Sequence, residues 1–370
     1  MSAQRRRISR RRFLGTASAA AAGLAVGVTK PLLVYAQTKK DIKFTLPWVA
    51  EGSNLIAFVA KGTDLFAKHG INVDIARGFG SVAAAQAIGA GQFDFGLSAA
   101  PAGILQAAKG LPVMMLLCTG YDATMGIGVL NDSGIKRPKD LEGRQMASTT
   151  TSGEYPYLPA FAEKAGFDLA KVSQVQVDNK VRDRLLAEKK VDAISGFAMS
   201  AMPGYIATGV PAHFMLYSDY GIPLYHNALM TQAERYKAEP ELCAAMAEAL
   251  SQAVKATLLD PAEAQKVFLK QVPEMALAAN GKEILRVGTG IYGYSAAREP
   301  LKLHGVGYHE PKDVELMIDL NMKYVAREGD KRPVASDIVT NKFAGQVTLS
   351  PAEWDQAIKG IQEFRGYLSA

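Results

Sequence analysis

Residues 80–96 of the chain read GSVAAAQAIGAGQFDFG. Ser81 stands where a helix cap belongs, and the alanine-rich run behind it predicts a short helix that ends at Gly91. Residues 93–97 then have the apolar composition of a buried strand. A helix that leads through a glycine turn into a strand is the repeating unit of α/β proteins.

The same alternation continues on both sides of this stretch. Before Cys118 we expect strands at residues 41–46, 71–76, 93–97 and 112–118, with helices capped by Ser53 and Ser81 and a further helix opening at Pro101. A second unit repeats the pattern, with strands at residues 126–130, 144–147, 172–177 and 192–196 and helices ending at Gly166 and covering 181–189. The sequence therefore predicts two α/β units.

The composition changes after Tyr225, where long amphipathic segments follow one another. We expect helices at residues 240–258, 261–270, 311–328 and 351–367. Their length and spacing suit helices that pack around the first sheet as a returning C-terminal half.

The N-terminus has the features of an export signal. Residues 1–36 contain seven cationic residues and no acidic one, and the apolar run at residues 13–28 is shorter than the roughly 20 residues that span a bilayer. Residues 9–14 read SRRRFL, which matches the twin-arginine signature, and a small-x-small cleavage site ends at Ala36. We expect residues 1–36 to be a signal peptide that the twin-arginine export machinery reads and that is cleaved near Ala36, which places the protein in the periplasm.

The charge of the chain is concentrated in this leader. The formal net charge is +6, and the seven leader cations leave −1 for the remainder. A basic arm that binds nucleic acid is the alternative interpretation, but an apolar run stands directly behind the arginines. No nucleic-acid partner is predicted.

The chain has two cysteines, Cys118 and Cys243, too few for a disulfide scaffold. We expect two buried thiols, although an oxidising compartment would permit one bridge if they met in space. Neither stands behind the signal where a lipid acceptor would lie. We therefore expect a protein that is free in the periplasm, and we expect it to be a monomer.

Residues 80–96, together with GLPV at 110–113, DLEGR at 140–144 and KVDAI at 190–194, resemble the nitrate, sulfonate and taurine substrate-binding proteins, which include the NMT1/THI5-like and SsuA-like proteins. The resemblance covers residues 41–230 and extends loosely into the helical tail. It implies an α/β protein with the type II periplasmic binding protein fold, in which two αβα lobes are joined by a hinge. Lobe one would comprise residues 41–123 and 227–370, and lobe two residues 124–226.

This resemblance also implies a function. The protein would capture a small organic ligand between its lobes, of sulfonate or taurine-like, carboxylate or pyrimidine-like chemistry, and deliver it to an ABC permease and its ATPase. It would not be an enzyme and would need no cofactor. The hinge would lie near residues 121–126 and 223–230. The turn after the first strand reads PWVAEG at 47–52 and departs from the family pattern, so the identity of the ligand does not carry over.

In open α/β sheets, ligands bind outside the carboxyl ends of the strands, where helix N-termini present free backbone N–H groups. The residues at these positions are mostly small, hydroxyl-bearing or aromatic. The candidate ligand-binding residues are Trp48, Ser53, Asn54, Gly80, Ser81, Ser98, Ala99, Tyr121, Thr150, Thr151, Ser152, Tyr155 and Phe197. Helix capping explains each serine and threonine as well, and core packing explains Trp48 equally well.

Other side chains near the same strand ends bear on the ligand's charge. The aromatic candidates favour a planar or partly apolar ligand over a bare inorganic anion. Glu51, Asp122 and Glu154 would oppose a strongly anionic ligand if they pointed inward, although such residues commonly face solvent. Arg77 would pair with an anionic group or remain solvated.

An exported α/β enzyme that uses a dinucleotide is the alternative function. Residues 78–83 read GFGSVA and fit the glycine-x-glycine-x-x-alanine fingerprint. However, the acidic residue expected roughly 20 positions later is replaced by GLS at 96–98. The five histidines show no pair at helical ligand spacing, so no metal site is predicted.

Overall fold

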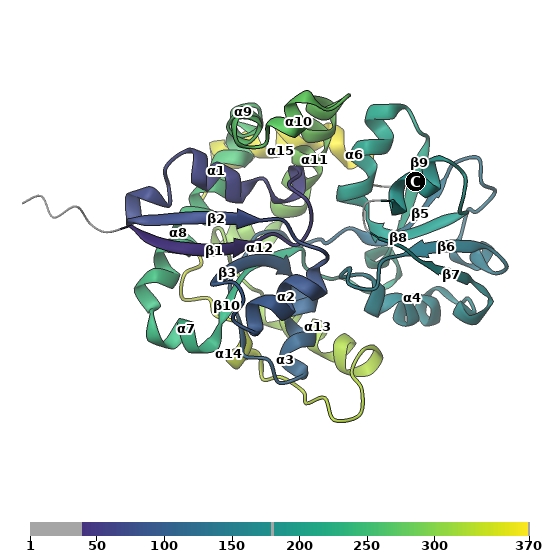
Figure 1. Cartoon of the computed structure of the whole chain (residues 1–370), viewed down its shortest axis with the longest axis horizontal. Helices are drawn as coiled ribbons and strands as arrows, with labels where there is room; N and C mark the ends of the chain where they lie inside the picture. The colour runs from purple at the N-terminus through teal and green to yellow at the C-terminus, as the bar shows by residue number, and fades with distance from the viewer. Residues whose placement is uncertain (1–38, 179–180, 369–370) are drawn as a thin grey trace, which may run out of the picture. The chain divides into compact units, whose positions relative to one another are not determined.

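The computed structural model describes residues 39–178 and 181–368. The predicted export signal and its cleavage site lie outside these residues. The described residues belong to one compact unit, which contains two five-stranded sheets with helices around them (Figure 1).

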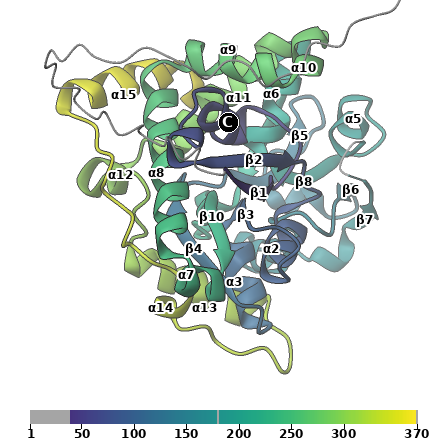
Figure 2. The same cartoon turned by 60° about the vertical axis from the view of Figure 1, so that its left-hand side comes forward.

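The first sheet has the strand order β2-β1-β3-β10-β4. Its strands are β1 (Lys40–Thr45), β2 (Ile71–Ala76), β3 (Phe95–Ala99), β4 (Val113–Cys118) and β10 (Asn227–Gln232). β1 pairs in parallel with β2 and β3, whereas β10 is antiparallel to both β3 and β4, between which it lies (Figure 2). The four strands predicted before Cys118 are present, with β3 two residues later than expected. β10 was not predicted, because its first five residues are all buried and so show no alternation.

The second sheet has the order β7-β6-β8-β5-β9. Its strands are β5 (Met125–Leu130), β6 (Gln145–Ser148), β7 (Ser173–Gln176), β8 (Ala193–Phe197) and β9 (Ala212–Leu216). β6 is parallel to β7 and β8, and β5 is antiparallel to β8 and β9. The two sheets therefore share one pattern, with a single antiparallel strand in the fourth position. The chain passes between them at residues 119–124 and 217–226.

The α-helices alternate with the strands and then continue to the C-terminus. In the first part of the chain they are α1 (Ile56–Gly62), α2 (Ser81–Gly89), α3 (Ala100–Ala108), α4 (Leu158–Ala165), α5 (Arg182–Ala187) and α6 (Ala198–Thr208). Beyond β10 they are α7 (Ala233–Ala238), α8 (Pro240–Leu259), α9 (Pro261–Gln271), α10 (Pro273–Leu277), α11 (Gly281–Ala296), α12 (Glu299–His304), α13 (Pro311–Tyr324), α14 (Ala335–Ile338) and α15 (Pro351–Arg365). Short 3-10 helices are η1 (Gly52–Asn54), η2 (Ala67–His69), η3 (Pro138–Leu141), η4 (Tyr155–Tyr157), η5 (Leu169–Lys171) and η6 (Tyr217–Tyr220).

The predicted caps differ from the observed ones. Ser53 lies inside η1 and caps no helix, since its hydroxyl donates to Glu51 instead. Ser81 is the first residue of α2, and Gly80 is the N-cap, without a side-chain hydrogen bond. The four helices predicted after Tyr225 are present, each with a proline in its first turn, where the missing N–H is tolerated.

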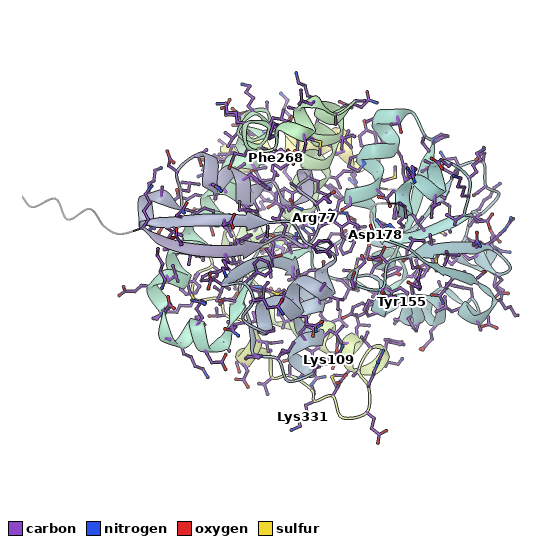
Figure 3. The ribbon with its side chains drawn as sticks, viewed as in Figure 1. Arg77, Lys109, Tyr155, Asp178, Phe268 and Lys331 are labelled. Atoms are coloured by element: carbon purple, nitrogen blue, oxygen red, sulfur yellow. The ribbon has the colours of Figure 1, made fainter. Side chains whose placement is uncertain are left out.

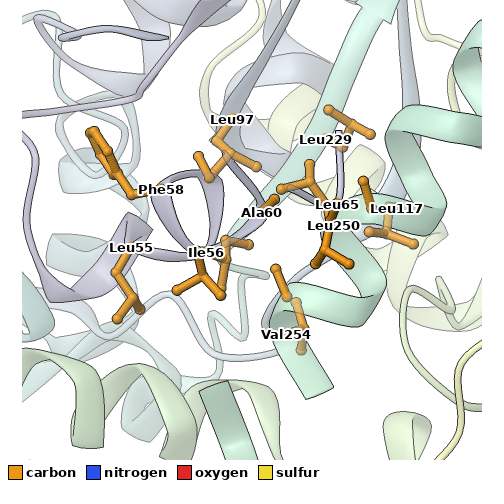
Figure 4. Packing of buried hydrophobic residues seen from close by; sticks show 14 of the residues in the cluster. Leu55, Ile56, Phe58, Ala60, Leu65, Leu97, Leu117, Leu229, Leu250 and Val254 are labelled. Atoms are coloured by element: carbon orange, nitrogen blue, oxygen red, sulfur yellow. The ribbon is translucent and has the colours of Figure 1, made fainter. Parts of the chain in front are cut away.

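Side chains from the strands of the first sheet, from α1 and its flanking residues, and from α8 form the core beside this sheet. Leu97, Leu117 and Leu229 come from β3, β4 and β10, and they pack in one cluster with Leu250 and other residues that Figure 4 shows. In the described part of the chain, α8 alone is long and apolar enough to cross a membrane, but 56% of its apolar window is buried inside the protein. It is packed as a core helix.

α11 connects the C-terminal helices to the second sheet. It contacts α6, α15 and η1. Its Val287 and Ile291 share a buried cluster with Ile194 of β8 and with Phe364 near the C-terminus. The C-terminal helices therefore pack beside both sheets, whereas the sequence placed them around the first one only.

Both cysteines are buried free thiols, as predicted. Cys118 is the last residue of β4, and its thiol donates to the carbonyl of Gly120 at 3.3 Å.

Candidate functional site

A narrow pocket, with about 20 Å³ of free space, lies where loops from the two sheets meet. The first sheet contributes the loop after β1, the start of α2 and the start of β10. The second sheet contributes the segments that follow β6, β7 and β8. The lining residues are Pro47, Trp48, Glu51, Ser53, Ser81, Ser152, Arg182, Phe197, Ser200, His226 and Asn227. The strand-end position of most of them is the one from which α/β sheets bind ligands.

Five of the predicted residues meet in this pocket: Trp48, Ser53, Ser81, Ser152 and Phe197. They come from both sheets and combine two aromatic rings with three hydroxyl groups. The structure therefore brings together part of the predicted set, with the polar groups and the aromatic surface in one place.

Four other predicted residues lie beside the pocket and shape its walls. The Asn54 side chain donates to the carbonyl of Val49 at 2.9 Å and thereby holds the loop after β1. The Ser98 hydroxyl donates to the carbonyl of Ser81 at 2.7 Å, and Ala99 is the buried N-cap of α3. Gly80 adopts a φ of 120°, and its N–H donates to Pro47.

The remaining predicted residues lie elsewhere. Thr150 and Tyr155 line a second, open pocket of about 700 Å³, which Lys109 also lines; Figure 3 labels Tyr155 and Lys109. The Tyr155 hydroxyl accepts a hydrogen bond from Gln176 at 3.1 Å. Thr151 donates from its hydroxyl to the carbonyl of Phe79 at 2.5 Å.

The ring of Tyr121 packs edge-on against Tyr225, with the centroids 5.3 Å apart. Arg77 lies over the Phe79 ring and donates to the carbonyl of Gly78. Asp122 accepts from the backbone of Thr124 and pairs with Arg298 at 3.4 Å.

Arg182 is the cation of the main pocket and is 1% exposed. Its Nε donates to Asp183 at 2.8 Å, and its Nη1 lies 3.9 Å from Glu154. Burial opposes the charged guanidinium, but Asp183 and Glu154 outweigh it and hold the pKa of Arg182 above its ordinary value. The guanidinium lies 5.4 Å from the centre of the Trp48 ring, so the arginine links the acidic groups to the aromatic wall.

Glu154 is fully buried beneath the same pocket. It accepts hydrogen bonds from Ser152 and Ser195, and the Ser195 hydroxyl also lies 3.0 Å from that of Ser148. Burial raises the pKa of Glu154, while Arg182 and the two serines oppose the rise. The floor of the pocket is thus a network of carboxylate, guanidinium and hydroxyl groups.

Glu51 connects the two sides of the pocket. Its Oε1 accepts hydrogen bonds of 2.6 Å from Ser53 in η1 and of 2.6 Å from Ser200 in α6. Burial raises the pKa of Glu51 to about 7, although both serine hydrogen bonds and the charge of Arg182 oppose the rise. This carboxyl therefore changes its charge near neutral pH.

Three buried nitrogen atoms that belong to pocket-lining residues have no hydrogen-bond partner among the described residues. They are Nη1 of Arg182, Nδ1 of His226 and Nδ2 of Asn227. Burial lowers the pKa of His226 to about 3, so its ring is neutral at ordinary pH. Because buried polar atoms are nearly always hydrogen-bonded, a ligand in the pocket would supply partners that these nitrogens lack among the described residues.

Sequence reasoning missed Pro47, Arg182, Ser200, His226 and Asn227. Arg182 opens the helix after β7, so the strand-end rule that selected the serines would have found it had it been applied to charged residues as well. Asn227 begins β10, the strand that was not predicted, and His226 directly precedes it. Within residues 39–178 and 181–368, no group of three histidine, cysteine or acidic residues could hold a metal ion.

Comparisons with known proteins agree with this architecture. A family model described as NMT1/THI5 like matches residues 53–264. A formylaminopyrimidine-binding protein of Halalkalibacterium halodurans is 23% identical over 236 residues, which are 64% of this chain and 72% of that protein.

Two solved structures share the fold. The alkanesulfonate-binding protein SsuA from Xanthomonas axonopodis pv. citri, bound to MOPS, has a TM-score of 0.61 and 16% identity, covering 81% of this chain and 98% of that one. The periplasmic nitrate-binding protein NrtA from Synechocystis PCC 6803 has a TM-score of 0.58 and 12% identity, covering 90% and 91% of the two chains. The fold is that of the periplasmic binding proteins, as expected. Because the family model matches more than half of this chain, the chain belongs to the NMT1/THI5-like family.

Proposed function

We propose that this protein is the solute-binding component of an ABC-type importer, which holds a small organic ligand in the pocket between its two sheets and presents it to a membrane permease with its ATPase. The observation that carries the proposal is the pocket itself, because residues from both sheets line it and three buried nitrogens of those residues have no hydrogen-bond partner among the described residues. Because the pocket is narrow, the two lobes would part to admit a ligand and close on it, since a ligand bound there would contact both sheets at once.

We also propose the lobes and location that the sequence indicated. Residues 41–123 and 227–370 would form lobe one and residues 124–226 lobe two, and the lobes would move about a hinge near residues 121–126 and 223–230, which overlaps the segments where the chain passes between the sheets. The protein would be a periplasmic monomer that reaches its compartment by twin-arginine export.

The dinucleotide alternative meets an obstacle at the glycine turn before α2. A phosphate at a helix N-terminus needs free backbone N–H groups and room for its oxygens. Here the N–H of Val82 already donates to the carbonyl of Thr151, and that oxygen lies 2.1 Å from the position a Cβ of Gly80 would take. The chain itself occupies the place of the phosphate, which supports binding without a dinucleotide.

The charges of the pocket favour an organic ligand over an inorganic anion. Arg182 is its one cation among the described lining residues, and Asp183 and Glu154 already balance it. Trp48 and Phe197 add aromatic surface. These features suit a pyrimidine-like, taurine-like or carboxylate-bearing molecule whose charge is balanced or small.

Thermal denaturation of the full chain with a ligand panel tests the proposal. The panel contains sulfonates, taurine, small carboxylates, pyrimidines and flavins. A ligand at a hundred times its Kd stabilises the folded state by about 2.7 kcal/mol, so one class should raise the Tm by several degrees. Mass spectrometry of that ligand should find it unchanged. A panel without any stabiliser, or conversion of the stabiliser, contradicts the proposal.

A further inference from the structure

We propose that Glu51 determines which ligands the pocket accepts by binding a nitrogen-bound hydrogen of the ligand, while Arg182 and Asn227 bind an acceptor atom of the same molecule. The inference rests on the proposed function and names its substrate class. The class is a small molecule without net negative charge that carries an N–H donor and, elsewhere on its framework, a hydrogen-bond acceptor.

The acceptor half follows from two nitrogens that have no hydrogen-bond partner among the described residues, although one of them lies 3.9 Å from the Glu154 carboxylate. Nη1 of Arg182 and Nδ2 of Asn227 are obligate donors, and both residues line the pocket. Arg182 is 1% exposed and Asn227 2% exposed, so bulk water does not solvate these side chains well. A ligand oxygen or ring nitrogen would satisfy them.

The donor half follows from Glu51. Both hydrogen bonds from serine hydroxyls end on Oε1, the side chain also forms a capping box with the backbone N–H of Asn54, and no side chain among the described residues donates to Oε2. An ionised carboxylate is an acceptor with several lone-pair sites, and a bond from a ligand N–H would be charge-assisted. The same carboxylate would repel a ligand that offers only negative charge.

The charged and polar groups around Glu51 do not cancel its preference for a ligand that carries an N–H donor. α5 contributes Asp183 and Arg182, whose charges act on the carboxyl in opposite directions. α6 contributes the Ser200 hydroxyl, and α11 presents Gly288 and Thr289 to η1, neither of which titrates. The ring of His226 in the same pocket is neutral.

The preference should depend on pH. Burial raises the pKa of Glu51 to about 7, so the carboxyl is mostly protonated at pH 5.5 and mostly ionised at pH 8.5. Only the ionised form is a full acceptor. A ligand with an N–H donor should therefore gain affinity as the pH rises through 7, relative to its partner without the donor.

Two matched pairs of probes measure this effect. 4-Aminopyrimidine and pyrimidine differ by a ring amino group, and taurine and ethanesulfonate differ by an ammonium group. Isothermal titration at pH 8.5 should give about tenfold tighter binding for the donor member of the pair that the pocket accepts, since a charge-assisted bond contributes about 1.5 kcal/mol or more. The pair that responds tells whether the donor belongs to a heteroaromatic ring or to an ammonium group.

Two variants tie the effect to Glu51, and a third is the control. Glu51→Gln should reduce the ratio of the two affinities to about threefold or less and make it independent of pH. Ser200→Ala, which removes a hydrogen bond that lowers the pKa of Glu51, should move the midpoint of the ratio to higher pH. Glu188→Gln, at an exposed glutamate beyond the site, should behave as the wild type.

The outcomes distinguish a failure of this inference from a failure of the proposed function on which it rests. Binding of no probe and no panel member contradicts the proposed function and this inference together. Binding in which the donor and its partner bind equally, or in which the ratio survives Glu51→Gln at every pH, overturns the role of Glu51 and leaves solute binding in place. Should Glu51→Gln fail to fold, the shifted midpoint of Ser200→Ala decides alone.

Discussion

The backbone N–H of Val82, at the start of α2, donates a hydrogen bond of 3.1 Å to the carbonyl oxygen of Thr151, in the loop after β6. The two residues belong to segments that follow strands of different sheets. The Thr151 hydroxyl adds a second bond, to the carbonyl of Phe79. This contact joins the two sheets at the rim of the pocket that Ser81 and Ser152 line.

Gly80→Ala should break this contact. The new Cβ would lie 2.1 Å from the Thr151 oxygen at a φ of 120°, where L side chains are strained. We expect a loss of about 2 to 4 kcal/mol in the free energy of unfolding, measured by urea denaturation. Gly110→Ala is the matched control, since it has a φ of 87° with open space around the Cβ, and it should lose only about 1 kcal/mol. Equal losses in the two variants would mean that the contact contributes nothing.

Substitutions of Ser152 and of Thr150 should affect ligand binding to different extents. Ser152 lines the main pocket and donates to Glu154, whereas Thr150 lines the second pocket. Ser152→Leu should therefore lower the affinity of the best ligand at least a hundredfold in calorimetry, while Thr150→Leu should change it less than threefold. Loss of binding in Thr150→Leu alone would place the ligand in the second pocket.

Arg182→Met should destabilise the protein strongly. The variant leaves Glu154 buried without its cation, and removing one partner of a buried pair costs about 3 to 5 kcal/mol. The control is Arg184→Met, at an exposed position two residues further along α5. This variant should lose less than about 1 kcal/mol of stability. Chemical denaturation of both variants checks this, and similar stabilities would show that the buried network does not depend on Arg182.

The stability of the ligand-free protein should depend on Glu51 between pH 4.5 and 7. Its pKa is about 7 in the folded state against 4.5 as the ordinary value, so the folded state binds the proton more tightly. The contribution of this group to stability therefore increases as the pH falls from 7 toward 4.5, by up to about 3 kcal/mol. The difference between wild type and Glu51→Gln isolates it, because the depressed pKa of His226 acts in the opposite direction in both proteins. Parallel pH profiles of the two proteins would contradict the assignment.

Local pattern was enough to predict most of the parallel strands. β2 has the predicted bounds, Ile71–Ala76, and the helix after it begins at Ser81, because apolar runs and glycine turns are local signals. The same signals placed Trp48 and Ser152 at strand ends, and both line the pocket.

The features that the sequence did not reveal depend on distant segments. β10 is a strand because β3 and β4 flank it, more than a hundred residues away in the chain. α11 contains Gly288, Gly290 and Gly293, which weaken a helix in isolation, yet here they allow close packing against Gly52, Phe364 and Ile361. Asn227 became a candidate ligand contact only once its burial and its missing hydrogen-bond partner were known.

The position of β10 within the first sheet also constrains how the protein folds during its synthesis. On the ribosome, residues 40–118 emerge long before residues 227–232, and until the latter arrive β3 and β4 have a gap between them where a strand belongs. The early part of the nascent chain cannot complete its sheet and must wait, with unpaired strand edges that invite aggregation. A protein of this topology should therefore depend on chaperones during translation and finish folding only after most of the chain has been synthesised.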